Sequence, residues 1–204
     1  MKEKAITFKS KDFKIEGLLY KAGPKGIVVT HPHPLYGGNM DNAVVEIIVQ
    51  TFQELEFSTL RFNFRGVGAS QGVYDNGKGE AEDARAALNY LAQIGINKRY
   101  LAGYSFGAWV NAQRSPQEKD TAPMVMVSPP VAFMQFDDRQ AIPNLKLVIT
   151  GSHDEIAPEQ MVAEQLASWN PTAKLEIISG ADHFYSGCLH ILAETLRAAI
   201  VSDF

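Results

Sequence analysis

The chain has 204 residues, of which 46% are hydrophobic and 21% charged, and its 19 basic and 23 acidic residues give a net charge of −4. This composition suits a single globular domain over residues 1–204 and argues against intrinsic disorder. No basic cluster stands out, so nucleic acid is not expected as a partner, because binding a phosphate backbone requires a positive stripe.

The only cysteine is Cys188, so no disulfide can form within the chain. This fits a reducing compartment. The sequence begins with Met1–Lys4 (MKEK) and continues with alternating residues, not with the apolar core of a signal peptide. No stretch approaches the roughly 18 apolar residues that would span a bilayer. We therefore expect a cytoplasmic protein without membrane contact, and the sequence does not predict its oligomeric state.

The first predicted elements form an antiparallel hairpin. Residues 4–9 and 13–20 alternate between apolar and polar side chains, as half-buried strands do. The run at 27–29 (IVV), which ends at Thr30 and His31, is instead typical of a strand that is covered on both faces. A hairpin edge next to a buried strand is therefore expected.

Helices and strands then alternate. Apolar residues from Val44 to Leu55 recur with helical spacing, and this period outweighs their β-branched content. Residues 59–64 predict a strand. A helix is expected around 84–91, with acidic residues at its positive N-terminal end. Residues 99–102 predict a strand that runs into a short helix.

The second half of the chain continues the alternation. Strands are predicted at 124–127 and 145–149, and residues 128–144 between them offer no periodic segment that could build a second domain or a large lid. Pro158 can occupy the first turn of a helix. A last strand at 175–178 and a closing helix at 189–200 complete an α/β fold with a mostly parallel sheet and helices on both faces.

Ligands of such sheets bind beyond the carboxyl ends of the strands, and the chemically interesting residues lie there. Residues 103–107 (GYSFG) match the nucleophile-elbow pattern G-x-S-x-G between a predicted strand and a predicted helix. The two glycines let strand and helix approach closely, and the turn pushes the Ser105 hydroxyl out of the sheet. The helix that follows directs its amides and its dipole at the same point.

A serine hydroxyl needs a base, and that base needs an orienting carboxylate, in the chain order Ser, Asp or Glu, His. Asp154 follows the strand at 145–149, and His183 follows the last strand, so both fall on the edge that carries Ser105. The weaker candidates are Glu155, Asp137, Asp138 and Asp182 for the acid, and His153 and His190 for the base.

These features together resemble the α/β-hydrolase superfamily over essentially the whole chain, and within it the small lidless bacterial hydrolases related to dienelactone hydrolases. The matching stretches are His31–Pro34, Arg61–Gly66, Gly103–Gly107, Gly151–Asp154 with Pro158, and Asp182–His183. The resemblance implies hydrolysis of a small ester or thioester through a covalent acyl-enzyme, with water as second substrate and with no metal or organic cofactor.

Two departures from the family pattern bear on function. Dienelactone hydrolases carry cysteine at the elbow, whereas this chain has Ser105, so dienelactone hydrolysis is not predicted. Many relatives have His-Gly where this chain has His31-Pro32-His33-Pro34. An oxyanion hole needs two amide donors, and proline has none. The amide of Phe106 is expected to supply one, with that of His33 as first choice and that of Leu35 as second choice for the other.

The acyl site is expected to be open and to prefer short or modest acyl groups over long lipids. Its predicted walls are Leu35, Tyr36, Tyr104, Phe133 and Phe136.

Three alternatives remain. The His31-x-His33 pair could ligate zinc, although no third ligand is evident. An acyltransferase would use the same three residues. An inactive binding protein of the same fold would usually have lost one of them.

Overall fold

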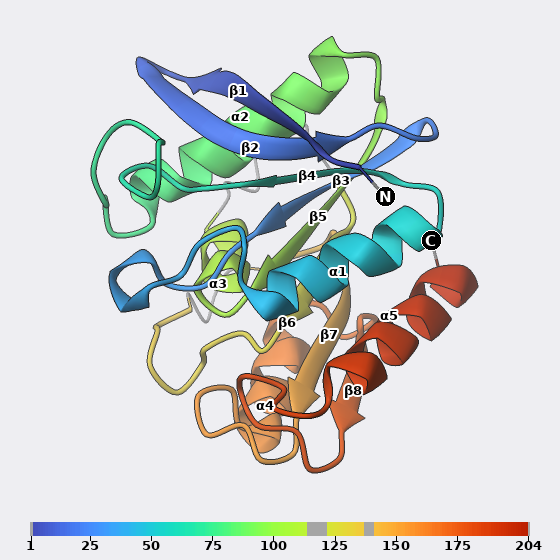
Figure 1. The fold of residues 1–204 in the computed structure, drawn as a ribbon. Coiled ribbons are helices and arrows are strands. Elements are labelled where there is room, and N and C mark those ends of the chain that lie inside the picture. Colours follow the sequence, from blue (N-terminus) through green and yellow to red (C-terminus); the bar gives the residue numbers. More distant parts are fainter. Residues whose placement is uncertain (1, 114–121, 137–140, 204) are drawn as a thin grey trace.

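The computed structural model describes residues 2–113, 122–136 and 141–203. Within them an eight-stranded sheet has the order β1-β2-β4-β3-β5-β6-β7-β8 (Figure 1). The strands are β1 (Lys4–Ser10), β2 (Phe13–Tyr20), β3 (Lys25–Thr30), β4 (Ser58–Phe62), β5 (Lys98–Tyr104), β6 (Met124–Val127), β7 (Leu145–Gly151) and β8 (Lys174–Ile178). Strand β2 is antiparallel to β1 and β4, and the other pairs are parallel.

Helices cover both faces of the sheet (Figure 1). Helices α1 (Ala43–Glu54) and α5 (Leu189–Asp203) pack on one face. Helices α2 (Lys78–Gln93), α3 (Phe106–Ala112) and α4 (Glu159–Trp169) pack on the other. A 3-10 turn, η1 (Pro34–Tyr36), follows β3. The predicted α/β architecture, a mostly parallel sheet with an N-terminal antiparallel hairpin and helices on both faces, is confirmed, and the described residues form no large cap.

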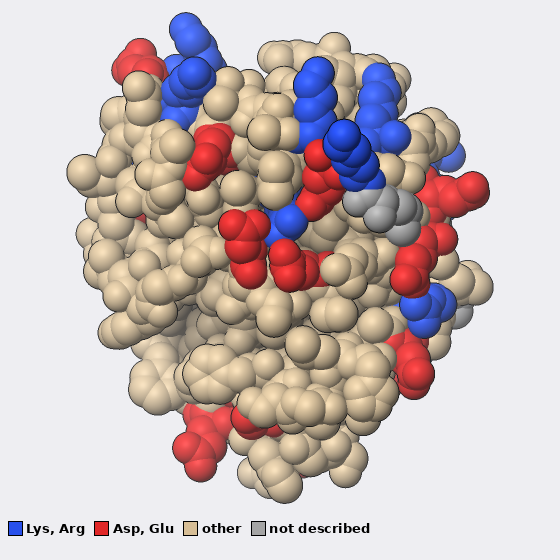
Figure 2. All heavy atoms as spheres, viewed as in Figure 1, with Lys and Arg blue, Asp and Glu red and all other residues tan. Residues whose placement is uncertain are grey.

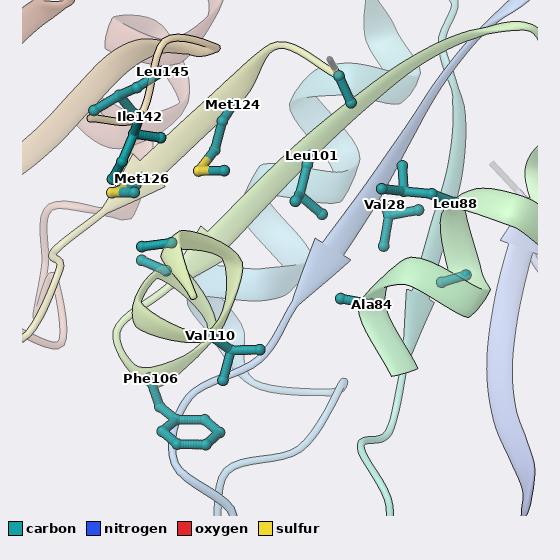
Figure 3. Packing of buried hydrophobic residues seen from close by; sticks show 14 of the residues in the cluster. Val28, Ala84, Leu88, Leu101, Phe106, Val110, Met124, Met126, Ile142 and Leu145 are labelled. Carbon is teal, nitrogen blue, oxygen red and sulfur yellow. The ribbon is translucent and has the colours of Figure 1, made fainter. Parts of the chain in front are cut away.

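Each face has its own apolar core, and the strands supply both. Ile27 and Val29 of β3 pack in the core beneath α1 and α5. Val28 between them packs in the core beneath α2, α3 and α4. Figure 3 shows this second core, in which Val28, Leu101 and Met124 extend from neighbouring strands. A strand buried on both faces has no polar face, which explains the continuous apolar runs of the sequence.

Several element boundaries differ from those predicted. Helix α2 begins at Lys78, because Gly77 adopts a left-handed conformation and Glu80 accepts the amides of Asp75 and Gly77. Helix α4 begins at Glu159, with Pro158 just outside it. Strand β4 ends at Phe62. No helix in the described part of the chain is long and apolar enough to cross a bilayer.

The topology brings distant segments to one edge. Strands β3, β5, β6, β7 and β8 are parallel neighbours, so their carboxyl ends lie on the same side of the molecule. The segments that follow these five strands therefore meet there, and the candidate site is built from them.

Candidate active site

Ser105 lies on a strained turn between β5 and α3. Its φ is 54° and its ψ is −120°, a backbone conformation that residues other than glycine rarely adopt. A Cβ atom on Gly103 would lie 2.5 Å from the Gly107 carbonyl carbon, and one on Gly107 would lie 2.6 Å from the Thr30 carbonyl oxygen. Only glycine at both positions allows β3, β5 and α3 to approach this closely.

A continuous hydrogen-bonded chain joins Ser105, His183 and Asp154. The Ser105 Oγ is 2.9 Å from Nε2 of His183, and Nδ1 of His183 is 3.0 Å from both carboxylate oxygens of Asp154. All three residues are buried, with Ser105 8% exposed. Because the carboxylate can only accept, Nδ1 carries the proton and Nε2 is left to accept from the serine hydroxyl.

Asp154 is held as a carboxylate by its surroundings. Burial alone would raise the pKa of Asp154, but hydrogen bonds from His183, Ala157 and Ser128, together with the charge of His183, lower it below its usual value. The amides of Ile156 and Ala157 donate to Oδ1 at 2.9 Å and 2.7 Å. The acid therefore stays ionised and keeps one orientation.

Two further hydroxyl groups support the site, and the sequence reasoning did not find them. Ser128 follows β6 and hydrogen-bonds Asp154. Its hydroxyl is 2.9 Å from that of Tyr185. Both residues are fully buried. The signal for Ser128 was its place just after a buried strand, like that of Asp154. Tyr185 carried no comparable signal.

Tyr104 precedes the serine and positions the histidine. Its hydroxyl donates to the backbone carbonyl of His183 at 2.9 Å. Burial raises the pKa of Tyr104, so this donor keeps its proton. The predicted pocket residue therefore also anchors the loop that carries His183.

The loop after β3 places His33 next to α3. The Leu35 amide donates to Nδ1 of His33 at 3.2 Å, so the second-choice oxyanion donor is already engaged. The His33 ring lies 4.6 Å from that of Phe106, measured between ring centroids. Phe106 is the first residue of α3, and the amide of such a residue has no partner within its own helix. Phe106 and His33 are therefore neighbours, and their amides as the oxyanion donor pair stay a prediction.

Residues of the Arg61–Gly66 stretch fasten the far end of this loop. Asn63 Oδ1 accepts the amide of Met40 at 2.8 Å, and Arg61 donates to the carbonyl of Met40 at 2.9 Å. Arg61 and Asn63 therefore hold the end of the loop that carries His33.

His31 is a structural residue. Its Nε2 accepts the amide of Phe64 at 3.0 Å, so Nδ1 holds the proton and donates to the Pro32 carbonyl at 2.7 Å. Nδ1 of His33 accepts from Leu35, and its Nε2 is 3.2 Å from the hydroxyl of Tyr74. Each ring nitrogen of the H-x-H pair therefore has a protein partner, which removes the reason to assign this pair to a metal.

The weaker candidates lie elsewhere. Glu155, His153 and His190 are exposed. Asp182 accepts the amides of Phe184 and Ser186 and so shapes its own loop. Asp137 and Asp138 fall outside the described residues.

A pocket of about 560 Å³ opens above Ser105. Of the predicted walls, Tyr36, Tyr104 and Phe133 line it and Leu35 does not. Phe136 is 5% exposed, and its ring packs 4.7 Å from that of Trp169. The prediction for Phe136 is therefore wrong, because that side chain belongs to the core beneath α4. The predicted walls left out several apolar lining residues, among them Pro130, Met134, Ile156 and Phe184.

Comparison with known proteins agrees with this architecture. No model of a known protein family matches the chain. An uncharacterized protein of Rickettsia prowazekii is 37% identical over 193 residues, covering 88% of this chain and 81% of that protein. An α/β serine hydrolase homologue from Coxiella burnetii is 33% identical, with a TM-score of 0.87 and 97% of each chain covered.

A serine hydrolase without a lid from Xanthomonas campestris is 30% identical, with a TM-score of 0.89 and coverage of 99% of this chain and 95% of that one. The chain belongs to the α/β-hydrolase superfamily, among its small members without a lid.

Proposed function

We propose that the protein hydrolyses carboxylic esters or thioesters of short to modest acyl length through a covalent acyl-enzyme on Ser105. The observation that carries this proposal is the unbroken hydrogen-bonded chain from Asp154 through His183 to Ser105, at the floor of an open pocket. This arrangement supplies a nucleophile, a base and an orienting acid in the order that acyl transfer requires.

The first half of the reaction forms the acyl-enzyme. Ser105 Oγ attacks the carbonyl carbon of the substrate while Nε2 of His183 takes its proton, and Asp154 stabilises the imidazolium. When the tetrahedral intermediate collapses, the bond from carbon to the leaving oxygen or sulfur breaks. His183 then gives its proton to the leaving group.

The second half releases the acid. Water attacks the acyl-enzyme as His183 takes one of its protons, and the bond to Ser105 Oγ breaks as that proton returns to the serine. In both halves the oxyanion accepts hydrogen bonds from the amides of Phe106 and His33, helped by the dipole at the start of α3.

The experiment combines covalent labelling with hydrolysis of ethyl butanoate, followed by titration of the acid released. We expect a fluorophosphonate probe to label the wild-type protein at Ser105, and Ser105→Ala to abolish both labelling and hydrolysis. Ser168→Ala, which removes an exposed hydroxyl on α4, is the matched control and should behave as wild type. Labelling of Ser105→Ala at another residue would overturn the assignment. Product analysis in the presence of an alcohol separates hydrolysis from acyl transfer.

A further inference from the structure

Every exposed Phe, Tyr or Trp side chain in the described part of the chain lines the pocket above Ser105. These residues are Tyr36, Phe133 and Phe184, which are 86%, 75% and 66% exposed. They come from three separate loops, after β3, after β6 and after β8. Exposed apolar surface that gathers around one concave site marks a binding surface.

The three rings are carried on ordered backbone. Tyr36 lies in η1, which His33 caps at one end and Gly37 at the other. The amide of Phe133 donates to the Pro130 carbonyl at 3.1 Å, and that of Phe184 donates to Asp182 Oδ1 at 3.1 Å. A rim whose backbone is already fixed loses little conformational freedom when a ligand binds.

The pocket is also uncharged. None of the described residues that line it is a Lys, Arg, Asp or Glu. The charged side chains visible in Figure 2 gather mainly toward its upper half, and the hollow at the left is bordered by uncharged atoms. A charged substrate group would lose hydration here without gaining an ionic partner.

We propose that this aromatic rim binds an aromatic ring of the substrate, so that the preferred substrates are uncharged esters or thioesters carrying an aryl group. This inference rests on the proposed function and adds Tyr36, Phe133 and Phe184 as residues that determine specificity. Aromatic rings stack offset or edge to face, which distinguishes an aryl group from a saturated ring of similar size.

The test measures the ratio of kcat/KM for two substrates that differ only in aromaticity. Ethyl 3-phenylpropanoate and ethyl 3-cyclohexylpropanoate place the ring on the acyl side. 3-Phenylpropyl acetate and 3-cyclohexylpropyl acetate place it on the alcohol side. We expect the wild type to favour the phenyl member by about tenfold in at least one pair.

In the triple variant Tyr36→Leu, Phe133→Leu, Phe184→Leu, this ratio should fall to near one. A ratio within one variant cancels any general loss of activity. Val73→Ala, which removes an exposed apolar side chain outside the pocket, is the control and should keep the wild-type ratio. A ratio near one for both wild-type pairs, or a preference that the triple variant keeps, would overturn the inference.

A binding measurement separates this inference from the proposed function. Calorimetric titration of Ser105→Ala with 3-phenylpropanamide and 3-cyclohexylpropanamide reports recognition without reaction. Tighter binding of the phenyl amide by several-fold supports the rim even if no ester is hydrolysed. If the two affinities are equal while wild-type Ser105 is labelled normally, recognition of an aryl group by the rim is overturned. The proposed hydrolase function is then unaffected.

Discussion

The hydroxyl groups of Ser128 and Tyr185 lie 2.9 Å apart in the protein interior, and that of Ser128 hydrogen-bonds Asp154. Because a carboxylate can only accept hydrogen bonds, Ser128 donates to Asp154 and its oxygen accepts a hydrogen bond from the Tyr185 hydroxyl. Burial raises the pKa of Tyr185, which keeps this donor protonated. The chain of hydrogen bonds that ends at Ser105 therefore begins at Tyr185.

Tyr185→Phe should weaken this support. Loss of the tyrosine proton leaves Ser128 free to rotate away from Asp154, which costs about 1 kcal/mol and lowers kcat about fivefold with little change in KM. Ester kinetics under saturating substrate measure the effect. Tyr100→Phe, which changes a tyrosine in the core beneath α1, controls for the substitution itself. An unchanged kcat in Tyr185→Phe would show that the two hydroxyls do not assist the acid.

Asp154→Asn should lower kcat by roughly 10³- to 10⁴-fold, because an amide would stabilise the wrong tautomer of His183. Glu155→Gln, at the exposed neighbouring position, is the matched control and should keep its activity. A large loss in Glu155→Gln beside a near-normal rate in Asp154→Asn would move the acid role to Glu155.

His33→Ala removes the acceptor that fixes the Leu35 amide, although the backbone amide of residue 33 remains. We expect the loss of this cap to loosen η1, to cost about 1 kcal/mol and to lower kcat about fivefold. His33→Asn should restore most of the activity, since asparagine is a strong cap. Equal losses in both variants would mean that the imidazole itself is required.

Folding stability should fall as the pH drops from about 6.5 toward 4. Burial lowers the pKa of His31 to about 4. In the unfolded chain the pKa of His31 is near 6.5. Between pH 6.5 and 4 the unfolded chain therefore binds a proton at His31 that the folded protein does not bind, which lowers the free energy of unfolding by about 3 kcal/mol at pH 4.

Urea unfolding at several pH values measures this dependence. His31→Gln should flatten it, although the variant is less stable overall. His190→Gln changes an exposed histidine and should leave the dependence unaltered. A wild-type slope that persists in His31→Gln would assign the effect to other groups.

Acyl length should matter because the rim of the pocket is exposed to solvent. The distal carbons of a long alkyl chain should stay largely in water there and gain little on binding. We expect kcat/KM for p-nitrophenyl butanoate to exceed that for p-nitrophenyl palmitate several-fold. The reverse order, measured below the aggregation concentration of the palmitate, would contradict an open short-acyl site.

The fold was predictable because hydrophobic period and element order determine it. Val28 could be assigned to a doubly covered strand from its neighbours alone. The proximity of Ser105, Asp154 and His183 followed from the rule that parallel strands end at one edge, while their catalytic role stays a prediction.

Other parts of the site depend on packing that no local pattern reports. Phe133 and Phe136 follow the same strand in a segment without periodicity, yet one lines the pocket and the other packs against Trp169. Phe184 reaches the pocket because Asp182 shapes its loop. The burial of Phe136 depends on a contact with a residue that is distant in sequence, whereas the position of Phe184 depends on a local turn.

Ser105 holds a positive φ of 54°, a backbone conformation that is costly for a residue with a Cβ atom. Glycine would relieve the strain of that turn. The variant Ser105→Gly should therefore gain folding stability while it loses the proposed activity. Stability alone would therefore favour glycine over serine at this position.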